Sequence, residues 1–205
     1  MKKFTCLVIA LMLCLTATAF AESVPSRMTG DMTSIEVTAE NMPADSGFFI
    51  QPVPTDDPVY QEKINVCTTE VEKLAGSSSV ERYFGEIRDN EGNIVSLKDA
   101  LGADTLNVFE FCPLIAGEYE EAYGKVTAKM LFSTPYEKAE KVIVMIGLVT
   151  VDANGNQSIQ WTAYEGIGLG AVGATEGMGG IQVELDSEIV KAIEEGIALL
   201  AVVSK

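Results

Sequence analysis

Two stretches of this chain are apolar at nearly every position, over lengths that suit strands. They are Val142–Val149 (VIVMIGLV) and Ile197–Val203 (IALLAVV). Successive residues of a strand point to opposite faces, so such a run has to be covered on both sides. Both stretches are therefore predicted to be central strands. We expect the core to include Val142, Val144, Ile146, Trp161, Leu199, Ala201 and Val203.

Period-two alternation recurs along the chain and predicts a mainly β protein. Short strands separated by turn residues favour a β-sandwich, most plausibly immunoglobulin-like, with a short helix between the last two strands. Within one strand, Trp161 and Tyr164 point to opposite faces, so one is expected in the core and the other at the rim. The expected strands are 34–39, 48–53, 106–112, 125–132, 141–151, 159–165, 181–185 and 197–204.

Helical signals lie between the early strands and near the C-terminus. The longest predicted helix follows a cap at Asp57, has apolar residues at spacings of three and four, and ends at Gly76. Shorter helices are expected at 79–84, 96–101 and 187–195, each followed by a glycine. These helices are predicted to pack on the sandwich.

The first 21 residues have the organisation of a secretory signal peptide. Lys2 and Lys3 precede a mostly apolar run, and a small-x-small site ends at Ala21. The apolar run is shorter than the about 20 residues of a membrane-spanning helix, which disfavours an anchor. A lipoprotein signal is disfavoured because neither Cys6 nor Cys14 follows a small, uncharged residue of the required kind. The sequence predicts export to the exterior or the cell surface, without membrane insertion after cleavage.

Beyond the signal, residues 22–33 lack periodicity and are predicted to be a flexible leader. Residues 34–205 suit one domain, with a strand and helical part at 34–104 and the sandwich at 105–205. The segments LNVFEFCPLIAGEYEEAYGKV and ELDSEIVKAIEEGIALLAVVS belong to a stretch, residues 96–205, that resembles a module of exported proteins from Gram-positive anaerobic bacteria. The resemblance implies an immunoglobulin-like sandwich and an exported protein, and it implies no activity.

Charge and composition exclude several classes of function. Loss of Lys2 and Lys3 with the signal leaves 12 basic residues against 30 acidic ones, a formal charge of −18. Such a surface repels nucleic acid and anionic membranes, and it favours solubility or cationic partners. The chain has no histidine, which excludes Ser-His-Asp and Cys-His nucleophiles and histidine-ligated zinc. The remaining Cys67 and Cys112 form either one disulfide or two buried free thiols.

Two sequence patterns resemble ligand-binding loops only in part. Gly166–Gly180 contains G-x-G-x-x-G, but the residues after it cannot sustain the helix that a dinucleotide site needs, so no cofactor is predicted. This segment is expected to be a loop between two strands, with Leu169, Val172 and Met178 available for binding. Asp89–Asn93 and Asp152–Asn156 space oxygen ligands as calcium loops do, but lack the required later positions, so turns are predicted.

The function predicted from these observations is a non-catalytic binding or interaction module, secreted or attached to the surface. Its partner would be an unknown protein or an envelope polysaccharide, and its ligand-binding residues are predicted as Tyr119, Tyr123 and Met178. One alternative is a hydrolase with paired carboxylates, because Glu110 and Glu165 adjoin aromatic residues, as do Glu118, Glu120 and Glu121. Another is a structural accessory subunit of an envelope assembly.

Overall fold

The computed structural model describes residues 32–205 apart from 55–56, 134–135, 155 and 172–178. Its strands are β1 (Met32–Ala39), β2 (Phe49–Pro52), β3 (Ile87–Asp89), β4 (Ile94–Val95), β5 (Asn107–Gly117), β6 (Val126–Phe132), β7 (Lys141–Val151), β8 (Gln157–Ala171), β9 (Gly179–Leu185) and β10 (Ile197–Ser204). Its helices are η1 (Pro58–Tyr60), α2 (Gln61–Ala75), α3 (Val80–Phe84), α4 (Leu97–Leu101), η2 (Glu121–Tyr123) and α5 (Ser187–Glu195). The predicted signal peptide, residues 1–21, lies outside the described residues, as does 22–31 of the predicted leader, whereas Met32 and Thr33 open β1.

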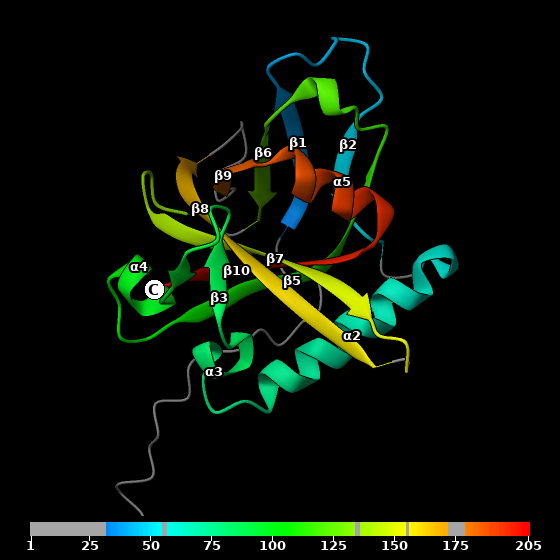
Figure 1. Cartoon of the computed structure of the whole chain (residues 1–205). Coiled ribbons are helices and arrows are strands. Elements are labelled where there is room, and N and C mark those ends of the chain that lie inside the picture. Colours follow the sequence, from blue (N-terminus) through cyan, green and yellow to red (C-terminus); the bar gives the residue numbers. More distant parts are fainter. Residues whose placement is uncertain (1–31, 55–56, 134–135, 155, 172–178) are drawn as a thin grey trace, which may run out of the picture.

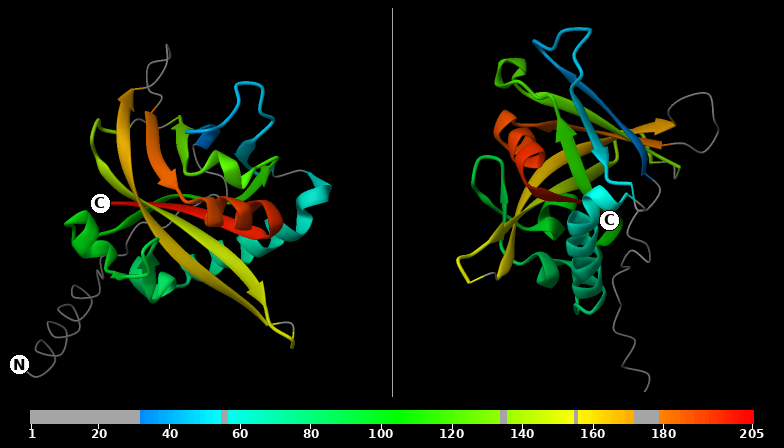
Figure 2. Two further views of the ribbon diagram at one scale, coloured as in Figure 1. Left: turned by 45° about the horizontal axis from the view of Figure 1, so that its top comes forward. Right: turned by 90° about the vertical axis from the view of Figure 1, so that its right-hand side faces the viewer.

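The described strands belong to one large sheet with the order β1-β6-β9-β8-β7-β10-β5-β2. Every neighbouring pair along this order is antiparallel. The sheet curls until β1 and β2, at its two ends, lie near each other, which makes it nearly barrel-like (Figures 1 and 2). A sandwich requires two separate sheets packed face to face, so the predicted sandwich and its immunoglobulin-like topology are not confirmed.

Both faces of the sheet are covered, as the apolar runs predict. On the inner face, α5 packs over β5 and β10 with its apolar side, whereas α2, α3 and α4 cover the outer face (Figure 1). All seven predicted core residues are buried. They divide between the faces: Val142, Val144 and Ile146 point inward, while Trp161, Leu199, Ala201 and Val203 point outward under the helices.

Local sequence signals set the helix boundaries. The side chains of Ser79 and Ser96 accept hydrogen bonds from backbone amides three residues ahead, which caps α3 and α4. Asp57 caps the short η1 turn instead of α2 itself, because Pro58–Tyr60 forms a 3₁₀ turn before the helix begins. The predicted helix at 187–195 matches α5.

β8 is longer than predicted, because it continues into the glycine-rich run that was expected to form a loop. Gly168 explains part of this: a Cβ there would lie 2.3 Å from the carbonyl oxygen of Glu137. The Gly168 amide donates to Glu140 O at 2.7 Å, and its carbonyl accepts from Ala139 N at 2.8 Å. Glycine therefore lets residues 137–140 approach β8 closely. Val172 and Met178 lie outside the described residues.

Trp161 and Tyr164 do point to opposite faces, but both are buried, so the prediction that one lies at the rim is wrong. Trp161 packs among Phe84, Phe111 and Tyr83 on the outer face. The rim is missing because helices cover one face and the curled sheet encloses the other. The sequence of one strand does not reveal that helices will cover one of its faces or that the sheet will enclose the other.

Candidate functional site

The predicted ligand-binding residues do not form an exposed aromatic surface. Tyr119 is 9% exposed and Tyr123 is 6% exposed, and both rings pack with Phe48 in the inner core. The Tyr119 hydroxyl donates to Gly124 O at 2.8 Å. Met178 lies outside the described residues. Ligand binding by these three residues stays a prediction, and the burial of the two rings does not support it.

Cys67 on α2 and Cys112 on β5 are buried free thiols in this structure. Cys112 belongs to the inner core and Cys67 to the outer one, so the sheet separates the two side chains. Burial, with the Glu110 carboxylate as second cause, raises the pKa of Cys67 to about 12 and that of Cys112 well above its usual value. Both thiols are therefore protonated and unreactive at neutral pH.

We expect neither thiol to react with a maleimide or a disulfide reagent while the mature chain is folded. Both should react in denaturant, because unfolding exposes them and restores their ordinary pKa. Mass spectrometry before and after denaturation counts the labelled sites. Fast labelling of either thiol in the native protein, or a bridged pair that needs reduction before it reacts, would contradict this arrangement.

The two acidic loops form turns, as predicted. Asp89 Oδ1 accepts from the backbone amides of Glu91 and Asn93 at 3.0 and 2.8 Å. Asp152 Oδ1 accepts in the same way from Asn154 and Asn156 at 2.8 and 2.9 Å. In each turn the second carboxylate oxygen accepts from the asparagine side chain four residues ahead. These bonds, that to the asparagine side chain first, hold the pKa of both aspartates below its ordinary value.

A lowered pKa in the folded state means that Asp152 contributes stability above its unfolded pKa of 3.8 and loses it as the pH falls through the lower folded value. The variant Asp152→Asn should therefore have a lower Tm than the wild type at neutral pH. The difference should shrink in acid well below that value, where Asp152 is also neutral. Thermal unfolding across the acid range measures it, and a difference that does not change with pH would contradict the assignment.

The carboxylates that the hydrolase alternative would use lie in unlike environments. Glu110 is 1% exposed, and its two oxygens accept from the backbone amides of Met32 and Phe111 at 3.1 and 3.2 Å. Glu165 is exposed and pairs with Lys141 at 2.7 Å. Glu121 pairs with Lys191 at 2.6 Å. Glu110 thus links the start of β1 to β5 by a hydrogen bond, and this bond stabilises the fold.

β8 changes partner along one of its edges, and this change defines the candidate site. All of β7 pairs with residues Gln157–Ile167 of β8. On the opposite edge, β3 pairs in parallel with Thr162 and Ala163, and β9 pairs in antiparallel from Gly166 onward. Tyr164 and Glu165 lie between these two paired segments. Among the described strands, neither β3 nor β9 pairs with them on this edge, and we call this place the fork. Figure 1 shows the β3–β4 hairpin crossing β8 at this place.

A pocket of about 230 Å³ opens at this fork, and we call it the fork pocket. Its polar side consists of the β3–β4 turn, with Asp89, Asn90 and Glu91, together with Tyr164 and Glu165 of β8. Its apolar side comes from β4, α4, β7 and β8. The apolar residues are Val95, Ala100, Ile143 and Ala163.

Tyr164 borders the fork pocket, but its side chain belongs to the inner core, whereas Ile143 and Ala163 of the pocket belong to the outer one. The Tyr164 side chain is 5% exposed, and its hydroxyl makes no hydrogen bond with any described residue. In the described part of the chain every fully inaccessible side-chain oxygen has a partner, so the unbonded hydroxyl oxygen reaches solvent. Burial, with Asp186 and Glu188 as further causes, raises the pKa of Tyr164 well above its usual value. The group is therefore a neutral hydroxyl at physiological pH, able to donate and accept.

A hydrogen bond between distant segments holds the β3–β4 turn at the start of α5. Asn90 Nδ2 donates to Asp186 Oδ2 at 3.0 Å, across 96 positions of sequence. The other Asp186 oxygen lies 3.5 Å from Lys125 Nζ. The turn that lines the pocket is thus fixed both to β8, through β3, and to α5.

The sequence did not identify this site. Asp89–Asn93 was predicted only as a turn, without the strands β3 and β4 that flank it, although Ile87 and Ile94-Val95 border it as in a hairpin. The parallel pairing of β3 with β8 joins residues about 74 positions apart, such as Arg88 and Thr162, and no local pattern announces it. Tyr164 was assigned to one face of a strand, without a partner or a cavity.

No group of three acidic or cysteine side chains in the described residues is arranged to hold a metal ion. No helix in the described part of the chain has the length and apolarity to cross a bilayer. Among the described residues, other pockets lie at Glu165, Ile167, Leu169, Gln182, Val183 and Glu184, and between α2 and the β7–β8 hairpin.

Comparisons with protein-family models, curated proteins and solved structures give no match for this chain. The resemblance of residues 96–205 to a module of exported proteins therefore stays a prediction. The chain is, on its own residues, a mainly β protein with one nearly closed antiparallel sheet.

Proposed function

We propose that this protein is an exported, non-catalytic binding module whose binding site is the fork pocket. One observation carries the proposal: β3 and β9 pair with successive parts of the same edge of β8, and a pocket with apolar and polar walls opens where one partner replaces the other. Sites of this kind combine apolar walls with a few polar groups that fix the orientation of a ligand.

The scaffold around the pocket supports binding without large rearrangement. Its walls come from β4, β7, β8 and α4, and the Asn90–Asp186 hydrogen bond holds the turn that forms the rim. A preorganised site loses little conformational freedom when a ligand enters. As part of the same proposal, the chain is exported and its partner is a protein or an envelope polysaccharide outside the cell or at its surface. We also propose that residues 96–205 are related to the immunoglobulin-like module of exported proteins, and the sequence resemblance described above is the support for this relation.

A hydrolase is the weaker candidate. A glycosidase needs two carboxylates about 5 to 9.5 Å apart across a cleft that admits a sugar chain. Glu165 borders the fork pocket, but Glu110 is engaged with backbone amides in the interior. Asp89 uses both of its oxygens within its own turn.

The proposal is tested by immobilising the mature chain, residues 22–205, and passing fractionated envelope protein and polysaccharide of the source organism over it. We expect saturable retention of one fraction. Ala100→Phe, which fills the apolar side of the pocket, should abolish the retention. Val59→Phe is the matched control, because it adds the same ring at a side chain that is 80% exposed on η1, and it should retain as the wild type does. Equal retention by both variants, or release of sugar or peptide fragments, would contradict the proposal.

A further inference from the structure

We draw no further inference here: the strongest candidate, the groove of about 320 Å³ on the exposed face of β8 and β9, where Ile167 is 56% exposed beside Glu165 and Glu184, carries nothing because nothing in the structure shows what covers it.

Discussion

Replacing either of two adjacent residues of β10, Val202→Asp or Val203→Asp, is expected to prevent folding. The two side chains point to opposite faces, Val202 into the inner core and Val203 into the outer one, and both are fully buried. An unpaired carboxylate in either core loses its hydration, and the valine's apolar contacts are lost as well, at a combined cost on the order of 5 kcal/mol or more. That is comparable to the whole stability of an ordinary domain.

Val151→Asp is the matched control, because this valine of β7 is 58% exposed and should accept the same change with little effect. The milder variants Val202→Thr and Val203→Thr keep the comparison measurable where the aspartates do not fold. Each should lower the free energy of unfolding by about 1–3 kcal/mol, because each buries a hydroxyl in an apolar core. A large loss for one threonine and none for the other would show that one face of the sheet is not covered.

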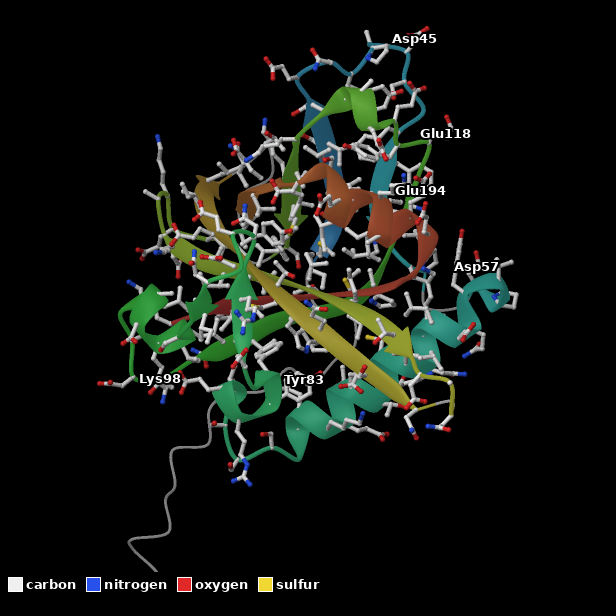
Figure 3. All side chains as sticks on the ribbon, in the orientation of Figure 1. Asp45, Asp57, Tyr83, Lys98, Glu118 and Glu194 are labelled. Carbon is white, nitrogen blue, oxygen red and sulfur yellow. The ribbon has the colours of Figure 1, made fainter. Side chains whose placement is uncertain are left out.

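Truncation of Phe111 to alanine is expected to lower the free energy of unfolding by about 3–5 kcal/mol. Phe111 is fully buried on the outer face of β5. Its ring lies edge-on to Trp161 at 5.8 Å and to Tyr83 at 6.2 Å between centroids. Tyr83 projects from α3 toward α2, where its hydroxyl donates to Glu70 at 3.0 Å, so Phe111 supports the attachment of both helices (Figure 3).

Urea unfolding followed by far-ultraviolet circular dichroism measures this loss. Phe109→Ala serves as the control on the same strand, because Phe109 is 43% exposed and its truncation should cost less than about 1 kcal/mol. Similar losses for the two variants would contradict the packing of α2 and α3 against β5. An unchanged m-value would show that the change acts on stability and leaves the compactness of the denatured state as it was.

Patterns within one element predicted most of the secondary structure. β7, β10 and α5 have the predicted bounds, because apolar periodicity and capping residues act over neighbouring positions. The covered faces of β7 and β10 followed from the same reasoning, since a strand that is apolar on both sides has to be enclosed. These features need no knowledge of which strands pair.

Pairing between distant strands could not be predicted, and the candidate site depends on it. A curled single sheet and a sandwich use the same alternating strands, and they differ in whether β9 and β10 join the same sheet as β1 and β6. The fork arises because β3 and β9 share one edge of β8, and both pairings are long-range. The aromatic residues nominated from the sequence, Tyr119 and Tyr123, were chosen without that knowledge, and they pack in the core.

The central claim, that the protein binds its partner at the fork of β8, is tested most directly by hydrogen–deuterium exchange of the mature chain alone and with the retained envelope fraction. We expect slower exchange at 87–95 and 162–166 in the presence of the fraction, and no such change in the Ala100→Phe variant. The exposed end of the β7–β8 hairpin, near Val151, should exchange equally in both samples. Protection confined to that hairpin, or to the β8–β9 face around Ile167, with none at the fork, would contradict the account.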